Sequence, residues 1–405
     1  MNKIFLEEFC DFQKGFAFKS KDYATEGTRI IKVSDLNEYN ITLDNCVYIK
    51  DSVQYENYKL LEDDVIITTV GSWETSPMSV VGKVVRVQKE AAGSLLNQNA
   101  VRVRTKNPLD QKFLFYLLKN KTFKNYIVST ARGSASQASI TQNSIKNFSF
   151  ILPDEKTRRS IAKILNNIDK KRDVCIKYQS VLLDVVSEIY KELFLQFDNF
   201  NFTTIGTNVT SLGWKVLSVY DIVQEIKDKN KEEKDYPVLS VVKEGEFKAS
   251  EDIFTKQVYS KSTKNYKIVR RNQVAYNPAR ANIGSIAMLK EYDVGLVSPI
   301  YTVFEMKDTI TPTFFYYYMK QPIFQEMIKH HAIGTTRQNF PFEAFKMFPM
   351  VVPPMELQLK FEEIAKPIEQ KITKLKEENE VLAEIRDTLL PKLMSGELPV
   401  EAGEN

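Results

Sequence analysis

The chain repeats a segment of its own sequence once, and this repeat limits the folds open to it. Residues 113–153 return in divergent form at residues 314–353, and a long helical pattern follows each copy. A globular unit and a helix written twice predict a pseudo-two-fold molecule that binds two similar objects or one object with two parts. The matched pairs are Phe113 and Phe314, Tyr116 and Tyr317, Lys119 and Lys320, Phe123 and Phe324, Gly133 and Gly334, Gln137 and Gln338, and, after a one-residue gap, Phe148 and Phe348.

Bulk properties indicate a globular protein of two or three domains. The chain has 405 residues, 43% of them hydrophobic, and its net charge of +4 permits nucleic-acid binding without requiring it. No apolar run approaches the ~20 residues that a membrane helix needs, and carboxylates follow the N-terminus too closely for a signal peptide. Three scattered cysteines, Cys10, Cys46 and Cys175, favour reduced thiols. We therefore expect a cytoplasmic protein with no membrane partner.

Short β-rich runs and amphipathic helical patterns alternate in both copies, which predicts an α+β fold. The runs lie between Gly, Asn and Ser turns, and Pro312 suits the first position of a helix. The predicted strands are residues 65–70, 80–87, 236–242, 273–276 and 285–289, and the predicted helices are residues 113–128 and 312–329.

Two further helices are too long for an ordinary globular domain. Apolar residues recur every seven positions in both, with the same phase at an offset of 200 residues, which predicts a coiled-coil seam. The first seam is Ile161, Ile168, Cys175, Leu182 and Ile189, with Leu165, Val186 and Leu193 between; the second is Phe361, Ile368, Leu375, Leu382 and Leu389, with Ala365, Ile372 and Leu393 between. Polar residues interrupt the seam at Arg172, Gln179, Asn379 and Arg386. Two unrelated amphipathic helices, each packed on its own domain, are the alternative.

These patterns divide the chain into five segments. The fold we predict is two pseudo-repeated, mixed α/β globular units, each followed by a long spacer helix. The segments are residues 1–153 (first unit), 154–197 (first helix), 198–353 (second unit), 354–396 (second helix) and 397–405 (tail).

Known catalytic motifs do not occur in the sequence. There is no Walker loop, Gly-x-Ser-x-Gly elbow or dinucleotide fingerprint. The two histidines, His330 and His331, are adjacent at a predicted helix end, where a solvated surface is a better interpretation than a metal site. We predict no catalytic residue, metal or cofactor in this chain. The alternatives are a DNA methyltransferase or nuclease with degenerate motifs, and a coiled-coil tethering protein.

Loops carry the side chains best suited to recognition. Arg, Gln and Asn can form paired hydrogen bonds with base edges, and hydroxyl groups can hold phosphates. A loop with Gly, hydroxyl and Gln residues occurs in both copies, although any one of these residues could equally be ordinary loop surface. The predicted DNA-binding residues are Trp73, Arg132, Ser134 and Gln137 in the first unit and Arg280, Asn282, Thr335, Arg337, Gln338 and Asn339 in the second.

The two copies differ most in one loop. Seventeen positions separate Val65 from Gly82, but only ten separate the matching Val274 and Gly284, so the first copy carries an insert of seven. The insert contains Trp73 and lies at the position in the repeat that residues 277–282 occupy in the second copy. A shared scaffold with different loops predicts two readers of different sequences; neutral loop drift, with Trp73 in the core, is the alternative.

The chain resembles the specificity subunits of type I restriction-modification systems. The resemblance rests on the tandem units, the long helix after each unit, residues 14–18 (KGFAF), the loop at residues 277–285, and residues 386–398 (RDTLLPKLMSGEL). It implies that each unit is a target recognition domain for one half of a bipartite double-stranded DNA site. It also implies that the two helices pack antiparallel as a coiled-coil spacer.

The same resemblance implies a division of labour among subunits. Two methyltransferase subunits would dock on the helices, and restriction subunits can join them. S-adenosylmethionine, ATP and magnesium are then expected on those partners, and this chain would supply sequence specificity without catalysis.

Overall fold

The computed structural model describes residues 2–37, 40–44, 46–50, 52–73, 81–134, 137–195, 213–253, 262–332 and 339–400. Contacts divide the chain into two compact units: unit 1 is Met1–Ile176 with Glu377–Asn405, and unit 2 is Lys177–Lys376. Each long helix therefore contributes one part to each unit. The chain is a mixed α/β protein, as predicted.

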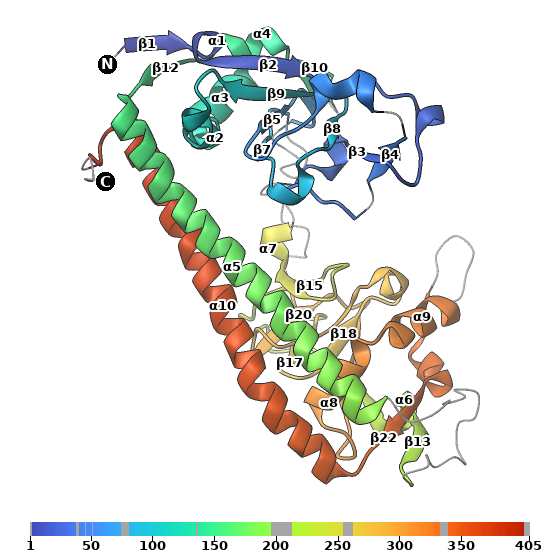
Figure 1. The fold of residues 1–405 in the computed structure, drawn as a ribbon. Helices are drawn as coiled ribbons and strands as arrows, with labels where there is room; N and C mark the ends of the chain where they lie inside the picture. The colour runs from blue at the N-terminus through green and yellow to red at the C-terminus, as the bar shows by residue number, and fades with distance from the viewer. Residues whose placement is uncertain are drawn as a thin grey trace. The chain divides into compact units, whose positions relative to one another are not determined.

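A four-stranded antiparallel sheet forms the centre of unit 1. Its order is β2 (Cys10–Lys14), β9 (Ala100–Thr105), β5 (Val65–Thr68) and β7 (Val84–Arg86). Val101 and Val103 of β9 point into the core, while Arg102 and Arg104, which alternate with them, are partly exposed, as the two-residue repeat of a strand requires. Two smaller sheets flank it: β1 (Asn2–Phe5) with β12 (Ser149–Leu152), and β4 (Val47–Ile49) with β3 (Thr28–Ile31) and β8 (Leu95–Leu96) (Figure 1).

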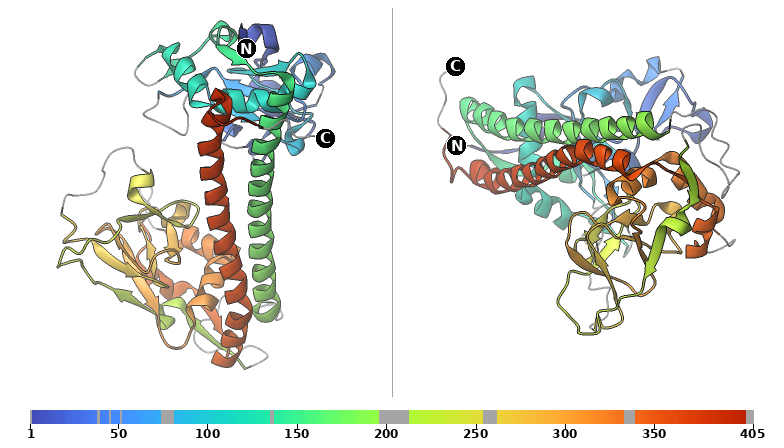
Figure 2. Two further views of the ribbon diagram at one scale, coloured as in Figure 1. Left: turned by 90° about the vertical axis from the view of Figure 1, so that its left-hand side faces the viewer. Right: turned by 90° about the horizontal axis from the view of Figure 1, so that it is seen from below.

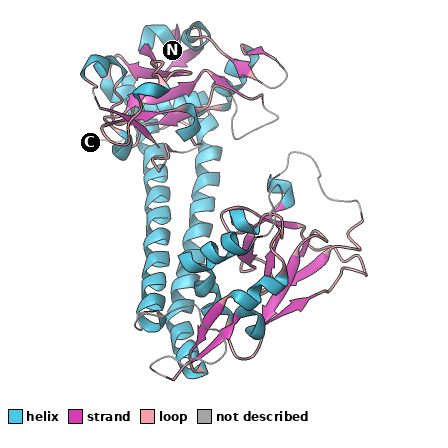
Figure 3. Ribbon diagram, turned by 90° about the vertical axis from the view of Figure 1, so that its right-hand side faces the viewer, coloured by secondary structure: helices cyan, strands magenta, loops and turns pink. Residues whose placement is uncertain are grey.

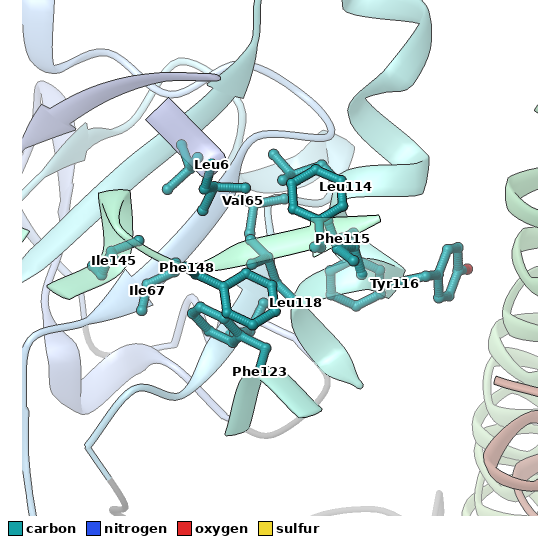
Figure 4. Close-up of a cluster of buried hydrophobic side chains, with 14 of the residues drawn as sticks. Leu6, Val65, Ile67, Leu114, Phe115, Tyr116, Leu118, Phe123, Ile145 and Phe148 are labelled. Atoms are coloured by element: carbon teal, nitrogen blue, oxygen red, sulfur yellow. The ribbon is translucent and has the colours of Figure 1, made fainter. Parts of the chain in front are cut away.

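The helix predicted at residues 113–128 is in fact two helices. They are α2 (Gln111–Lys119) and α3 (Lys121–Ser129), and the prediction of one continuous helix was wrong. Asn120 separates them because its backbone is extended and its side chain accepts a hydrogen bond from the Thr122 amide, which starts a new helix. Aromatic and aliphatic side chains from α2, α3 and β5 meet α1 (Leu6–Phe9) and α4 (Gln142–Lys146) in one core, in which Tyr116 lies at the edge with its hydroxyl directed toward the long helices (Figure 4).

Unit 2 repeats this plan with its own antiparallel sheet (Figure 3). The order β14 (Val223–Ile226), β21 (Thr302–Met306), β18 (Val274–Tyr276) and β19 (Ile286–Met288) matches the central sheet of unit 1 element by element. Three further pairs complete the unit: β13 (Lys215–Ser218) with β22 (Pro349–Val352), β15 (Leu239–Val241) with β16 (Phe247–Ala249), and β17 (Lys267–Arg270) with β20 (Val294–Val297). A short helix, α6 (Val219–Ile222), joins β13 to β14, and α7 (Ser250–Ile253) follows β16.

Several predicted boundaries in both units need correction. The helix expected at residues 312–329 is split into α8 (Pro312–Met319) and α9 (Pro322–His331), because Pro322 cannot continue the first helix and instead begins the second. The strand expected at residues 236–242 is only β15, since Pro237 precedes it. Of the strand expected at residues 80–87, the described residues form only β7, since Gly82 has a positive φ of 79°.

The long helices are α5 (Glu155–Phe194) and α10 (Met355–Ser395), of 40 and 41 residues. Within unit 1, the first part of α5 and the last part of α10 lie side by side (Figure 2). Every predicted seam residue on the heptad positions is buried or half-buried: Ile161, Ile168, Cys175, Leu182 and Ile189 on α5, and Phe361, Ile368, Leu375, Leu382 and Leu389 on α10. Leu193, also expected in the seam, is 42% exposed, and its neighbour Phe194 is buried in its place.

In unit 1, polar residues that interrupt the seam bind polar side chains of the other helix. Arg386 of α10 donates to Asp169 of α5 at 3.2 Å, and Arg172 donates to Asn379 at 3.1 Å. The later residue on one helix pairs with the earlier residue on the other, which is the pattern of antiparallel neighbours. Satisfied polar pairs of this kind set the register of a helix pair.

An aromatic cluster joins the two helices in unit 2. The ring of Phe361 on α10 lies 5.5 Å from that of Tyr190 and 5.6 Å from that of Phe194, both on α5. Tyr317 of α8 contacts the same ring at 5.3 Å. Apolar side chains of the long helices also belong to the core of unit 1, among them Ile161, Leu165 and Leu390, so both units pack on their helices through apolar contacts.

Candidate nucleic-acid interface

In unit 1, a small three-stranded sheet brings the predicted recognition loops together. It consists of β10 (Arg132–Gly133), β11 (Ala138–Ser139) and β6 (Val70–Gly71). The Trp73 indole donates to the Ser134 carbonyl at 2.7 Å and packs partly against the core. Trp73 thus holds the two loops to each other. It lies in a loop, as the recognition hypothesis expected, and it also packs against the core, as the alternative expected.

Three of the predicted residues in unit 1 face solvent beside this sheet. Arg132, Ser134 and Gln137 are exposed. Gly133 between them is required by geometry, because a Cβ at this position would lie 2.0 Å from the Gln137 carbonyl oxygen. Among the described residues, no carboxylate lies within ion-pair distance of Arg132.

In unit 2, a tight turn after β18 presents the corresponding loop. The Asn277 side chain accepts from the Ala279 amide, and Gly284 closes the turn with a φ of 96°. Arg280 is exposed at the tip, with no described carboxylate within ion-pair distance, and Asn282 is half-buried. Both lie in or beside the short 3-10 helix Ala281–Ile283.

The second predicted loop of unit 2 is described only at its end. Asn339 is exposed, and its neighbour Phe340 is buried. Thr335, Arg337 and Gln338, predicted to bind DNA, lie outside the described residues.

The two units hold these loops with the same backbone hydrogen bond. In unit 1 the Ile140 amide donates to the Thr69 carbonyl at 2.9 Å; in unit 2 the Phe340 amide donates to the Pro278 carbonyl at 2.9 Å. Each donor and each acceptor occupies the matching position of the repeat. The seven-residue insert of unit 1 therefore leaves the sheet at the point where the Arg280 turn leaves it in unit 2.

Across the described ranges, no three His, Cys, Asp or Glu side chains are grouped so that they could hold a metal ion. The rings of His330 and His331 are in contact at 5.1 Å, and burial, followed by the charge of His330, lowers the pKa of His331. No described helix combines the length and the apolar character that crossing a bilayer requires.

Comparison with known proteins agrees with the repeated architecture. The model of the type I restriction modification DNA specificity domain matches residues 1–177 and again residues 212–384. The chain belongs to this family and is a DNA sequence-specificity subunit. The role of the family is sequence recognition rather than catalysis.

Its relatives include subunits from archaea and bacteria. The MjaIX specificity subunit of Methanocaldococcus jannaschii is 23% identical over 325 residues, covering 75% of this chain and 73% of that one. The HindI specificity subunit of Haemophilus influenzae is 26% identical over 357 residues, covering 71% and 77%. Among solved structures, the S subunit of a type I system from M. genitalium superposes with a TM-score of 0.55 at 16% identity, covering 97% of this chain and 96% of that one, which supports the shared fold.

Proposed function

We propose that unit 1 and unit 2 each read one half of a bipartite double-stranded DNA site, and that α5 and α10, packed antiparallel as a coiled coil, separate the two readers. The observation that carries this proposal is the matched hydrogen bond from Ile140 and from Phe340, from which two different loops project. An identical support with different loops suits one scaffold adapted to two sequences. Arg132, Gln137 and Arg280 have the chemistry for base edges or phosphates.

We further propose that two methyltransferase subunits dock on the long helices. In unit 2, α5 carries a shallow apolar cleft of about 510 Å³, lined by Val181, Asp184, Val185, Glu188, Ile189, Glu192 and Leu193. Val181 and Val185 are exposed there, and the matching residues 200 positions later, Val381 and Ile385, are exposed on α10 in unit 1. Two related exposed strips suit two copies of one partner.

The cofactors of the reaction then belong to the partners. S-adenosylmethionine would bind the methyltransferase subunits, and ATP and magnesium would bind restriction subunits where these join the complex. The setting we propose is the cytoplasm, where DNA and these subunits meet. No observation favours the methyltransferase, nuclease or tethering alternatives.

The experiment that tests this function maps DNA methylation. The full chain is co-expressed with its methyltransferase partner in cells that lack other methylation, and modified bases are located by sequencing. We expect one bipartite motif with a fixed, unspecified spacer. A continuous motif, or methylation that is unchanged when this chain is left out, would contradict the proposal.

A further inference from the structure

A buried side chain near the start of α5 ties three parts of unit 1 together. The guanidinium of Arg158 donates two hydrogen bonds to the Asp110 carboxylate, at 2.9 and 2.8 Å, and a third to the Pro153 carbonyl at 2.7 Å. Asp110 immediately precedes α2, and Pro153 immediately follows β12. Both partners of the ion pair are buried, with 9% of Arg158 and 1% of Asp110 exposed.

Unit 2 makes the same junction with different chemistry. Gln358, 200 positions later on α10 and fully buried, accepts from the Thr311 amide at 2.9 Å. Its amide nitrogen donates to the Thr309 carbonyl at 3.1 Å and to the Pro353 carbonyl at 2.9 Å. In both units, the start of the long helix is thus joined to the end of the preceding strand and to the segment just before α2 or α8. We call Arg158 and Gln358, each with its three attachments, the elbow clamps.

A second attachment lies farther along each helix. In unit 1 the Tyr116 hydroxyl donates to Asp169 at 2.7 Å. In unit 2 the matching Glu369 instead accepts a hydrogen bond from Lys290 at 3.4 Å, and the buried Tyr317 hydroxyl has no hydrogen-bond partner among the described residues. Eleven residues separate the clamp from this second point, or about 16 Å at 1.5 Å per residue. Two attachments this far apart fix an angle, which a single contact cannot do.

We propose that Arg158 and Gln358 are positioning residues that hold each recognition unit at one angle on its helix, and so restrict the protein to one spacing between half-sites. This inference rests on the proposed function. A unit of ~150 residues has a radius of gyration of about 15 Å, so a turn of roughly 6° displaces its far side, about 30 Å away, by one base-pair step of ~3.4 Å. A small change in the angle between a recognition unit and its helix would therefore change the spacing between half-sites that the protein accepts.

Burial of the ion pair supports positioning over stability alone. Buried ion pairs contribute little net stability compared with apolar packing, whereas their fixed geometry specifies one arrangement. The planar guanidinium of Arg158 reaches Asp110 and Pro153 together, and the carboxamide of Gln358 reaches its partners through both of its polar atoms. A lysine could keep a charge beside Asp110 but could not form the paired contacts.

The test uses the full chain in complex with its methyltransferase partner, with methylated motifs read by sequencing. The variants are Arg158→Lys and Gln358→Met, the second of which removes both hydrogen-bonding atoms of the amide at similar volume. Arg159→Lys is the matched control, since the neighbouring Arg159 is exposed on the same helix and, among the described residues, forms its ion pair with Glu155. We expect both clamp variants to raise methylation at sites with the spacer one base pair longer or shorter by about tenfold, the change that 1.4 kcal/mol produces. Half-sites should not change.

The outcomes separate this inference from the proposed function. If the wild-type complex shows no bipartite motif, the proposed function fails before the variants are considered. If the wild type shows one spacer and both clamp variants keep it, with methylation lowered evenly at all sites, the clamps are structural and the inference is wrong. A changed half-site in either variant would also overturn it. Should Arg158→Lys not fold, the neutral Gln358→Met variant decides.

Discussion

Phe361 on α10 is the side chain whose removal should most clearly show how unit 2 holds its helices. Its ring is fully buried and meets three other rings, those of Tyr190, Phe194 and Tyr317, close to edge-on at 5.3–5.6 Å. These rings come from α5 and α8, so one side chain joins three helices. We predict that Phe361→Ala destabilises unit 2 selectively.

The size of the effect follows from burial and ring geometry. Truncation of a buried Phe to Ala costs about 3–5 kcal/mol of stability. Part of that cost is the loss of the edge-to-face ring pairs, each of which contributes roughly 0.5–1.5 kcal/mol in addition to the burial of apolar area. Domains are stable by only ~5–15 kcal/mol, so the loss is a large share of the total. Phe361→Ile should cost less, because Ile161 occupies the matching place in unit 1 and shows that this seam position accepts a branched aliphatic side chain.

The two tryptophans of the chain allow each unit to be followed separately. Trp214 is buried in unit 2, 6.2 Å from the Phe194 ring, and Trp73 lies in unit 1. In a Trp73→Phe background, urea unfolding followed by Trp214 fluorescence should shift to a midpoint lower by about 1–2 M for Phe361→Ala.

Leu359→Ala is the control for that measurement. Leu359 lies two positions away on the same helix and is 47% exposed, so its truncation should change stability by less than about 0.5 kcal/mol. An unchanged Trp214 midpoint in Phe361→Ala, or an equal shift in the two variants, would refute the reasoning.

Three further predictions concern recognition, assembly and chemistry. Arg280→Ala, and likewise Arg337→Ala, should relax only the half-site read by unit 2, at a cost of about 1–3 kcal/mol at one base position, and motif mapping that shows a change in the other half-site would contradict this. Leu375→Asp places a charge in a buried seam position, only 5% exposed, and should cost several kcal/mol and abolish the complex with two methyltransferase subunits, as light scattering would show. The purified chain alone, incubated with DNA and S-adenosylmethionine, should transfer no methyl groups; measurable transfer would count against a separate catalytic partner.

The sequence predicted the large features because they repeat or have long periods. Seven-residue spacing over 40 residues is strong evidence of a helix pair, and the phase of Ile161 and Phe361 identified buried faces correctly. The internal repeat also aligned Val65 with Val274, which the structure places on matching strands β5 and β18.

Local breaks were missed for a physical reason. Apolar spacing continues across Asn120 and Pro322, so periodicity alone indicated single helices there. Both residues carry a boundary signal, one as an N-cap and one as a first-turn proline, and these signals outweigh periodicity when the core can accept two short helices.

Contacts between distant residues could not be predicted from one sequence. The donation from Trp73 to Ser134 spans 61 positions, and only the tertiary fold shows that it joins two loops. The elbow clamps were missed because Arg158 and Gln358 share no chemistry, so the repeat gives no signal at that position. Their shared role appears only when the partners Pro153 and Pro353 are seen in the structure.

The division of the long helices suggests a direct test of their role as spacers. The two units separate between Ile176 and Lys177 on α5 and between Lys376 and Glu377 on α10, positions 200 residues apart. Four residues inserted at both points would leave the contacts inside each unit intact. Each residue adds 1.5 Å, so the helix pair would lengthen by about 6 Å, or roughly two base-pair steps of ~3.4 Å.

Rotation limits which insertions can work. Four residues turn a helix by about 400°, which leaves the seam ~40° out of phase, whereas seven residues leave it only ~20° out and add about 10 Å. The unspecified spacer should therefore grow by one or two base pairs with four residues and by about three with seven, with both half-sites unchanged. Two inserted residues, which turn the seam by roughly 200°, should abolish methylation. An altered half-site, or a spacer that stays the same at every insertion length, would show that the helices do not set the distance between the readers.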